Sequence, residues 1–585
     1  MRSEYARARW YRVHASAMLW TAGICVGWLV SGGMSDAGEM AAPPIRSGPT
    51  VQCRHGVVVS VSAPASRVGV EILRHGGNAV DAAVATAFAL AVTWPEAGNI
   101  GGGGFMLVFP GPASGAEPIV IDYRETAPAA ATADMFVTGR RSSYTLVGVP
   151  GTVRGLALAQ QKFGRLPWRE VVLPAIKLAR GGFDIDASLA RAINDVVRTS
   201  PDFLELRRVF GQKSVWRAGD RFIQPDLAET LQAIADQGPD AFYTGSIAKL
   251  LVDDVRRGRG IITASDLAQY QAKIRRPVRG TFRGYEVYAS PPPSSGGVAL
   301  VEMLNVLENF ELKEYGRFDP RTLHLMVESM RRAYCDRARY LGDPDFAAIP
   351  AELTSKPYAK RLASGIDPMR ATRSEDLARQ DGITLFWEGN QTTHLSVIDE
   401  QGMAVSNTYT LEESFGGRIM VKGAGFLLNN EMGDFNPRPG VTDRHGLIGT
   451  PPNQVAPGRR MLSSMCPAIV AKDGRAVLVT GSPGGRTIIN TVLCVTLNYL
   501  EFDMPPREAV DAPRMHHPWF PDELEFEPGL LRDHAAAIES LKRMGHAIGS
   551  RPARQGDAHT IWLDPPTGEY IGVADQRVSG AAAGY

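Results

Sequence analysis

Cysteine is scarce in this 585-residue chain, which contains five. No two of them form a C-x-x-C pair, and none has a companion histidine at the spacing of zinc ligands. These absences exclude a disulfide-stapled scaffold and a zinc ribbon. Cys335, Cys466 and Cys494 lie in or beside apolar stretches, so we expect them to be small buried apolar side chains.

An excess of charge of one sign is also missing. The chain has 63 Lys and Arg against 62 Asp and Glu, a net charge of +1, and no dense basic block interleaved with aromatic residues. Binding to a nucleic-acid backbone needs such a basic surface, so the sequence disfavours a nucleic-acid partner. With 44% hydrophobic and 21% charged residues, the composition is that of an ordinary globular protein.

Only one long hydrophobic run is present, at residues 15–30. Four arginines precede it within the first 12 residues, and small, flexible residues follow it at 31–38. This order is typical of an export signal. Because the run is near the lower limit for spanning a bilayer, an uncleaved membrane anchor is the alternative. We expect residues 1–42 to be a signal peptide or N-terminal anchor, and the remainder to be exported to the periplasm or the extracellular space.

The hydrophobic pattern changes along the chain. It is mostly helical up to about residue 380, and from Thr392 it alternates in short runs separated by Gly and Asn turns. The expected helices are 65–74, 79–93, 153–162, 168–180, 226–237, 246–256 and 298–309. The expected strands are 57–61, 105–109, 394–399, 404–410, 425–428, 467–471 and 476–480. The pattern therefore predicts a helix-rich first part and a sheet-rich last part.

A glycine run at 98–104 invites a dinucleotide-binding interpretation. A loop that cradles phosphates requires the order strand, glycine loop, helix, whereas here a helix comes before the loop and a strand after it. We therefore interpret the run as a tight loop that lets one stretch of backbone pass close to another.

Three local features near the sheet-rich part are individually weak. Gln391-Thr392-Thr393-His394 opens an expected strand, and Ser463-Ser464 precede another. Residues 477–485 form a strand and a glycine loop, followed by an expected helix at 486–500. Free backbone N–H groups at such a helix start favour negative charge. Because the loop lacks the Lys-Ser/Thr ending of a P-loop, a developing oxyanion suits it better than a phosphate.

Together with six further motifs, these features resemble the γ-glutamyltransferases, a family of N-terminal nucleophile hydrolases, over residues 56–585. The nine matching blocks are Gly77-Asn78-Ala79-Val80-Asp81-Ala82, Gly101-Gly102-Gly103-Gly104-Phe105, Asp122-Tyr123-Arg124-Glu125-Thr126-Ala127-Pro128, Pro292-Pro293-Ser294-Ser295-Gly296-Gly297, Thr392-Thr393-His394-Leu395-Ser396-Val397, Leu427-Leu428-Asn429-Asn430-Glu431-Met432, Leu462-Ser463-Ser464-Met465, Gly481-Ser482-Pro483-Gly484-Gly485 and Ala581-Ala582-Ala583-Gly584-Tyr585. Nine blocks in one order along one chain make an accidental match very improbable.

The resemblance implies a fold and a maturation step. The fold would be an α/β (α+β) four-layer αββα sandwich. The precursor would cut its own Gln391–Thr392 bond, giving a large subunit, 43–391, and a small subunit, 392–585, that stay together as a heterodimer. Cleavage would be the activation step, because Thr392 would then supply both its Oγ as nucleophile and its α-amine as base.

The resemblance also assigns roles to single residues. Thr410 would hold the Thr392 hydroxyl, and the backbone N–H groups of Gly484 and Gly485 would form the oxyanion hole. A glutamyl donor carries a carboxylate and an ammonium on one carbon. Arg124, Ser463 and Ser464 would face the α-carboxylate. Glu431 and Asp434 would face the α-ammonium.

One position departs from the family pattern. The usual motif reads Thr-x-Asn, whereas this chain has Thr410-Leu411-Glu412. Glu412, Glu431 and Asp434 would then crowd three acids around one ammonium, which raises the pKa of at least one of them. We expect the preference for an ammonium to survive or sharpen, and donor binding to become more dependent on pH.

Residues 439–460 correspond to the loop that covers the glutamyl pocket in many members of the family. His445 stands where a tyrosine often gates the site, and we expect it to make a lid contact. The pair His516-His517 lacks a suitably spaced acidic or Cys partner, so we interpret it as structural. The chemistry implied by the resemblance requires no organic cofactor and no catalytic metal.

The first functional hypothesis is an exported γ-glutamyltransferase that opens glutathione-like γ-glutamyl amides and passes the acyl group to water, an amino acid or a peptide. The alternatives within enzymes are a cephalosporin (glutaryl) acylase and a poly-γ-glutamate depolymerase. A glutaryl group has no ammonium to satisfy the acidic trio, which favours the glutamyl substrate. The alternative from another class is a non-catalytic binding protein that never matures.

Overall fold

The computed structural model describes residues 44–138, 142–381, 385–386, 391–550 and 553–585. The expected export segment, residues 1–42, lies outside the described residues. None of the helices in the described ranges combines the length and the apolar character that a membrane span requires.

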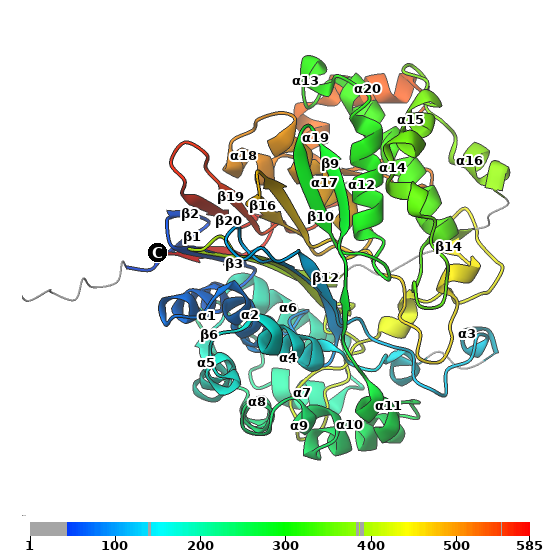
Figure 1. Ribbon diagram of the computed structural model, residues 1–585. Coiled ribbons are helices and arrows are strands. Elements are labelled where there is room, and N and C mark those ends of the chain that lie inside the picture. The colour runs from blue at the N-terminus through cyan, green and yellow to red at the C-terminus, as the bar shows by residue number, and fades with distance from the viewer. Residues whose placement is uncertain (1–43, 139–141, 382–384, 387–390, 551–552) are drawn as a thin grey trace, which may run out of the picture. The chain divides into compact units, whose positions relative to one another are not determined.

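Two antiparallel β-sheets lie face to face in the middle of the fold (Figure 1). In the described part of the chain, sheet A has eight strands in the order β1 (Arg46–Gly48), β21 (Ala581–Gly584), β3 (Gly56–Ser60), β12 (Gln391–Asp399), β13 (Ala404–Glu412), β4 (Gly103–Phe109), β5 (Ile119–Asp122) and β8 (Lys273–Arg275). Sheet B, counted in the same way, has seven: β2 (Thr50–Cys53), β20 (Tyr570–Val573), β19 (Thr560–Leu563), β16 (Arg475–Thr480), β15 (Ala468–Lys472), β10 (Tyr285–Ala289) and β9 (Val278–Phe282).

Helices cover the outer face of each sheet, which gives four layers in the order αββα (Figure 1). The helices on the side of sheet A are α1 (Ala63–Arg74), α2 (Ala79–Thr93), α4 (Thr152–Phe163), α5 (Trp168–Gly181), α6 (Ala187–Thr199), α7 (Leu204–Phe210), α8 (Pro225–Gln237), α9 (Asp240–Tyr243), α10 (Ser246–Arg257) and α11 (Ala264–Gln269). Those on the side of sheet B are α12 (Gly296–Leu307), α13 (Leu312–Tyr315), α14 (Pro320–Tyr340), α15 (Lys356–Ser364), α17 (Thr487–Leu500), α18 (Pro506–Asp511), α19 (Pro528–Asp533) and α20 (Ala535–Arg543).

Short elements complete the described chain. They are the helices α3 (Met135–Thr138) and α16 (Ser374–Asp381), the 3₁₀ turns Ser143–Leu146, Ala351–Thr354, Glu431–Asp434 and Pro451–Asn453, and the strand pairs β6 (Phe183–Asp184) with β7 (Arg221–Phe222), β11 (Leu385–Phe386) with β14 (Leu447–Ile448), and β17 (Met515–His516) with β18 (Glu525–Phe526).

Alternation along the strands of sheet A builds two hydrophobic cores. In β4, Met106 and Val108 pack among the helices α1, α2 and α4, whereas Phe105 and Leu107 pack between the sheets. Successive side chains of a strand point to opposite faces, so an almost wholly apolar strand serves both cores. Cys335, Cys466 and Cys494 are buried in the second core and form no disulfide within the described chain, and their burial is as the sequence predicts.

Helix α2 and the glycine loop after it place sheet A against its helices. Every residue of α2 is buried, and Asn78 and Asp81 close its first turn in a capping box. In the loop, a Cβ on Gly102 would lie 2.0 Å from the backbone O of Thr410. The loop therefore permits close backbone approach, as expected from the sequence, and a larger residue would displace β13.

The segments on either side of the Gln391–Thr392 bond share both sheets. In sheet A, β12 pairs with β3 on one side and with β13 on the other, and β13 in turn pairs with β4. In sheet B, β15 pairs with β10. A cut at this bond would leave two pieces joined by continuous hydrogen-bonded sheets and by shared cores.

The structure confirms most of the secondary structure expected from the sequence and corrects one strand. Residues 425–428 are not a strand: Gly425 has a φ of +71°, and only Leu427 forms an isolated bridge, to Met420. The segment is apolar because it is buried, but it folds back on itself in a tight turn, with Val421 N–H donating to the Phe426 carbonyl. An apolar run alone does not distinguish a strand from a buried turn.

Candidate active site

The residues singled out from the sequence converge on one small cavity, here called the Arg124 cavity. It has a volume of about 20 Å³ and includes every expected catalytic and substrate-binding residue except Gly484. Its walls are Arg124, Thr392, Thr410, Glu412, Glu431, Asp434, Ser463, Ser464, Met465, Gly485 and Ile488. These side chains come from β12, β13, the start of α17 and three loops.

Thr392 is the second residue of β12, in the middle of sheet A, and its side chain is buried. The register of β12 against β13 shifts here. Gln391 pairs with Glu412 and Thr393 pairs with Tyr409, so Thr392 lies opposite two residues of β13. Such a β-bulge bends the strand and re-aims the side chains around it, and bulges are common beside active sites. The side chain of Gln391 lies outside the described residues.

The bulge places Thr410 and Glu412 in the same cavity wall as Thr392. Asn99 donates to the backbone O of Thr410 at 2.9 Å, and the Thr410 Oγ1 accepts the N–H of Glu412 at 2.8 Å. Glu412 has a φ of +82°, in the left-handed region that favours glycine and asparagine. Its carboxylate accepts a hydrogen bond from the side chain of Asn430.

Gly484 and Gly485 lie in the loop that joins β16 to α17. Their φ angles are +127° and +55°, and a Cβ on Gly484 would lie 2.5 Å from Thr487 Oγ1. Among the described residues, neither glycine N–H donates a hydrogen bond, and α17 starts immediately afterwards. Free N–H groups and a helix start favour a negatively charged oxygen.

Arg124 is fully buried and bonds directly to acids. Its guanidinium forms ion pairs with Glu431 and Asp434, and it donates at 3.3 Å to the backbone O of Met461 and of Leu462. The sequence analysis assigned Arg124 to the α-carboxylate of a donor and these acids to its α-ammonium, whereas in the structure they bond to one another directly. Arg124 Nη1 is the atom that contacts Glu431 in its ion pair, and Glu125 lies 3.6 Å from the same nitrogen.

The acids around Arg124 share one cation. Burial raises the pKa of Glu431 and of Glu412 well above the usual range, and neighbouring carboxylates add to the effect. Glu125, which the sequence analysis did not assign to the site, lies 3.6 Å from Arg124, and burial raises its pKa to about 8. The cavity therefore contains more acid than one guanidinium neutralises, an arrangement suited to receiving a cationic group.

The loop Pro291–Gly297 and helix α14 hold the two serines in place. Ser463 N–H donates to the Pro293 carbonyl at 2.9 Å, and the Ser463 carbonyl accepts from Ser295 Oγ at 2.7 Å. Arg337 of α14 donates to Ser295 Oγ and to Ser464 Oγ, both at 2.9 Å. The sequence analysis identified this loop as one of the family motifs but did not identify Arg337, because no local pattern links α14 to Ser464.

His445 is exposed in the loop 439–460, where its N–H donates to Asp443 at 2.8 Å, and it is not among the residues that line the Arg124 cavity. The neighbouring Arg444 forms a 2.9 Å ion pair with Glu375. His445 thus lies in the expected loop without a contact that assigns it a role.

Two groups of buried histidines could be mistaken for metal ligands. His516 bonds to Asn490 at 2.6 Å and His517 to Asp522 at 3.2 Å, so the pair faces separate partners. His324, Glu328 and His546 lie close enough together for a metal ion. Glu328, however, already forms ion pairs with Arg331 and Arg332, which neutralise its charge and lower its pKa to about 2.

The four-layer fold and a threonine at the start of a central strand, beside a glycine loop with free N–H groups, define an N-terminal nucleophile hydrolase. Comparison with known proteins gives the family: residues 65–585 match the model of the γ-glutamyltranspeptidases. The chain is 43% identical over 581 residues to the glutathione hydrolase proenzyme of Escherichia coli K12, covering 96% of this chain and 98% of that protein. This chain belongs to the γ-glutamyltranspeptidase family.

Two solved structures relate the fold to function. The cephalosporin acylase from Bacillus halodurans superposes with a TM-score of 0.81 at 26% identity, covering 94% of this chain and 99% of that one. The γ-glutamyltranspeptidase from Pseudomonas nitroreducens complexed with L-DON is 41% identical, with a TM-score of 0.51. The match covers 54% of this chain and 96% of that chain. Both glutamyl and acylase chemistry therefore occur on this scaffold.

Proposed function

We propose that the chain is the precursor of a γ-glutamyltransferase and glutathione hydrolase, which opens γ-glutamyl amides through an acyl-Thr392 intermediate. The observation that carries the proposal is the Arg124 cavity, where Thr392 shares one small space with a buried arginine, a pair of serines and surplus acids. The arginine and the serines suit the α-carboxylate of a γ-glutamyl donor, and the acids suit the α-ammonium on the same carbon. Family membership supports the same chemistry.

In this proposal Thr392 becomes reactive when the Gln391–Thr392 bond is cut, because the new α-amine takes the proton from Oγ. The Gly484 and Gly485 N–H groups stabilise the tetrahedral oxyanion, and Thr410 holds the hydroxyl. Ser463, Ser464 and Arg124 bind the donor carboxylate, and Glu431, Asp434 and Glu412 bind its ammonium. The acyl group then passes to water or to an amine. His445 covers the occupied site as part of a lid.

The test of substrate class compares γ-glutamyl-p-nitroanilide with glutaryl-p-nitroanilide, which differ only in the α-ammonium. We expect the glutamyl donor to be cleaved with a kcat/KM at least about 100-fold higher, since leaving buried carboxylates unpaired costs several kcal/mol. A preference for the glutaryl donor would instead favour the acylase alternative, which the cephalosporin acylase neighbour supports. The assay is run with the isolated, matured protein.

The proposal includes two subunits and export. The large subunit, 43–391, and the small subunit, 392–585, remain a heterodimer because their strands alternate within sheets A and B. The N-terminal segment directs the protein to the periplasm or the cell exterior, or anchors it to the membrane. We expect the mature large subunit in the extracytoplasmic fraction to begin near residue 43, measured by intact mass. A cytoplasmic large subunit that retains residue 1 would contradict export.

Glu412→Asn should weaken the pH dependence of donor binding. Burial, and then Asp434, raise the pKa of Glu412, so a proton occupies it in the free site and leaves when a donor ammonium binds. Binding that releases a proton strengthens as pH rises, so the donor KM of the wild type should fall from pH 6 to 8. In the variant this fall should be largely lost. An identical KM profile in both proteins would contradict the role of Glu412.

The same change should stabilise the fold. An acid whose pKa is raised on folding contributes stability at low pH. This stability is lost as the pH rises above the pKa that the acid has in the unfolded chain. Asparagine also suits the φ of +82° better than glutamate. We expect the unfolding free energy to increase by about 1 kcal/mol, with a larger gain at pH 8 than at pH 5. Glu413→Asn, at the neighbouring position, is the matched control.

A further inference from the structure

The glycine loop before α17, residues 481–486, borders two cavities that Thr392 also lines. Gly485 lines the Arg124 cavity, and Gly484 lines a second cavity with a volume of about 460 Å³. The carbonyls of both glycines accept N–H groups from the first turn of α17 at 3.1 Å. The orientation of the two glycine peptides therefore depends on what holds this loop and the start of α17.

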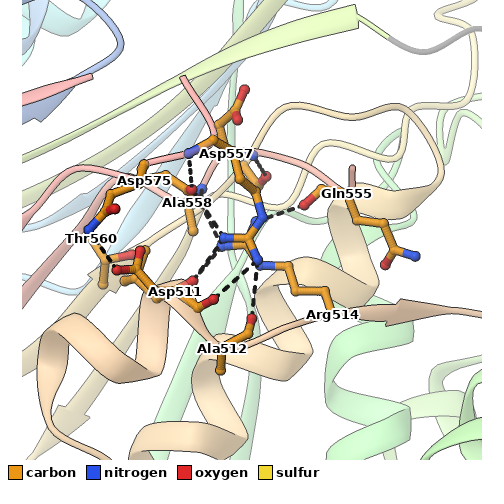
Figure 2. Close-up of polar contacts among 12 residues, drawn as sticks. Asp511, Ala512, Arg514, Gln555, Asp557, Ala558, Thr560 and Asp575 are labelled. Carbon is orange, nitrogen blue, oxygen red and sulfur yellow. Dashed lines mark hydrogen bonds and ion pairs between the residues drawn. The ribbon is translucent and has the colours of Figure 1, made fainter. Parts of the chain in front are cut away.

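The part of the loop before the glycines is held by a buried polar network (Figure 2). Ser482 Oγ accepts the Asp557 N–H at 2.9 Å. Behind Asp557, buried Arg514 donates to the Gln555 carbonyl at 2.7 Å and to Asp575 at 2.6 Å. This network fixes the entry to the loop and leaves open what fixes its exit.

Arg486, which follows Gly485 directly, holds the exit from the loop. Its side chain is only 9% exposed. Nη2 of Arg486 donates to the Gly446 carbonyl at 2.9 Å, and Nη1 donates to the Phe520 carbonyl at 3.4 Å. The carbonyl of Arg486 accepts a hydrogen bond from the hydroxyl of Tyr334 in α14. One residue therefore ties the start of α17 to three separate elements.

Two of these three partners belong to firmly packed parts of the fold. Tyr334 is buried in α14, and its ring packs edge-on against His516 with the ring centroids 5.7 Å apart. The loop that carries Phe520 is tied down by Asp522, which accepts the Ser374 N–H at 2.8 Å. Arg486 is fixed by these contacts, so it can in turn position its third partner, the loop that carries Gly446.

Gly446 lies near the tip of a compact loop, residues 440–449, within the expected lid. A 2.8 Å hydrogen bond between the first and last residues of this loop closes its base. The Asp443 side chain accepts the N–H groups of His445 at 2.8 Å and of Leu447 at 3.3 Å, which shapes the tip. A loop with its own internal bonds moves as one unit, so a bond to Gly446 also fixes the position of His445.

We propose that Arg486 is a positioning residue, which holds the oxyanion loop and the lid in one fixed relation. Arg486 lines neither cavity, so it acts through Gly485 on one side and through Gly446 on the other. This inference rests on the proposed function, in which the glycine N–H groups stabilise the oxyanion and the lid covers the donor. Without the bonds from the guanidinium, the first turn of α17 is held from fewer sides, and the N–H groups lose their alignment with the oxyanion.

A guanidinium suits this task better than an ammonium. Its planar fork presents donors in two directions, so Arg486 reaches the carbonyls of Gly446 and Phe520 at the same time. An ammonium is a point charge on a flexible stem and does not reproduce this fork. Arg486→Lys should therefore restore only part of the function that Arg486→Met loses.

The experiment compares an inhibitor that uses the oxyanion hole with one that does not. L-2-Amino-4-boronobutanoic acid carries boron in place of the reacting carbon. Thr392 Oγ bonds to the boron while its proton passes to the α-amine, and a boron hydroxyl then occupies the oxyanion position. L-Glutamate binds in the donor site without forming this bond. Both inhibition constants, Ki, are measured on matured protein whose cleavage is verified by intact mass.

In Arg486→Met we expect the Ki of the boronate to rise about 20-fold, and kcat for γ-glutamyl-p-nitroanilide to fall by a similar factor. The Ki of glutamate should change by less than about twofold, because glutamate does not use the oxyanion hole. In Arg486→Lys the boronate Ki should rise about fivefold. Arg207→Met is the matched control: Arg207 of α7 also donates to a backbone carbonyl, that of Val197 at 2.8 Å, but lines neither cavity. All its constants should equal those of the wild type.

The alternative roles of Arg486 give different results. If it only stabilises the fold, the thermal midpoint falls and both Ki values of the matured protein stay unchanged. If it acts only on the lid, both Ki values rise equally. Either result would overturn the proposal. Should Arg486→Met not mature, the two Ki values of Arg486→Lys decide in the same way. A wild type that releases no p-nitroaniline would instead overturn the proposed function itself.

Discussion

Thr392→Ala is expected to leave the precursor uncut and inactive. In the proposed mechanism, the substitution removes both the hydroxyl that attacks the Gln391 carbonyl during maturation and the nucleophile of the mature site. Activity on γ-glutamyl-p-nitroanilide should fall by a factor on the order of 10⁴ or more. On a denaturing gel the wild type should give two bands, and intact mass should place their boundary between Gln391 and Thr392. The variant should give one.

The controls separate chemistry from folding. Thr392→Ser keeps a hydroxyl and should still mature, more slowly, with part of the activity. Thr393→Ala changes the neighbouring buried threonine and should mature normally. Cleavage of Thr392→Ala at the same bond would contradict an N-terminal nucleophile. A wild type that stays intact and inert would restore the hypothesis of a binding protein.

Arg124→Gln is expected to abolish recognition of the donor carboxylate. A buried, charge-assisted pair of this kind is worth about 2–5 kcal/mol, so kcat/KM for γ-glutamyl-p-nitroanilide should fall by about 10² to 10³. A donor without the α-carboxylate, 4-aminobutyryl-p-nitroanilide, should be a poor substrate of the wild type and lose little more in the variant. The measurement is the ratio of the two kcat/KM values in each protein.

Removing Arg124 also leaves Glu431 and Asp434 without their cation, so stability has to be measured alongside activity. Arg124→Lys keeps the charge but not the planar fork, and it should recover the thermal midpoint more fully than the activity. An equal loss of kcat/KM on both donors would mean that Arg124 stabilises the fold and does not bind the donor carboxylate.

The sequence correctly predicted features that depend on short stretches of neighbouring residues. The helix 79–93 is apolar on nearly all sides and is wholly buried in the structure. The glycines before α17 and Thr392 near the start of β12 lie as their local patterns indicate. The strand expected at 425–428 was wrong because burial, which the residues do encode, does not determine hydrogen-bond pairing.

The structure shows side-chain contacts between distant segments that no local sequence pattern predicts. Arg124 meets Glu431 and Asp434 about 300 residues away because β4 and β5 carry it to the same end of sheet A as the turn after β13. Arg337 reaches Ser464 from α14, a helix that the sequence analysis did not single out. Both contacts depend on how the layers stack.

By itself, the sequence determined the family, and it predicted Thr392 as the nucleophile and the kinds of group in the donor site, because these depend on residues that stand next to one another. Only the tertiary structure decided that Arg124 already bonds to the acids, that Glu412 has a left-handed backbone, and that Thr392 borders two cavities. The physical reason is that burial and charge pairing depend on the three-dimensional surroundings of a group, which arise only when distant segments pack together.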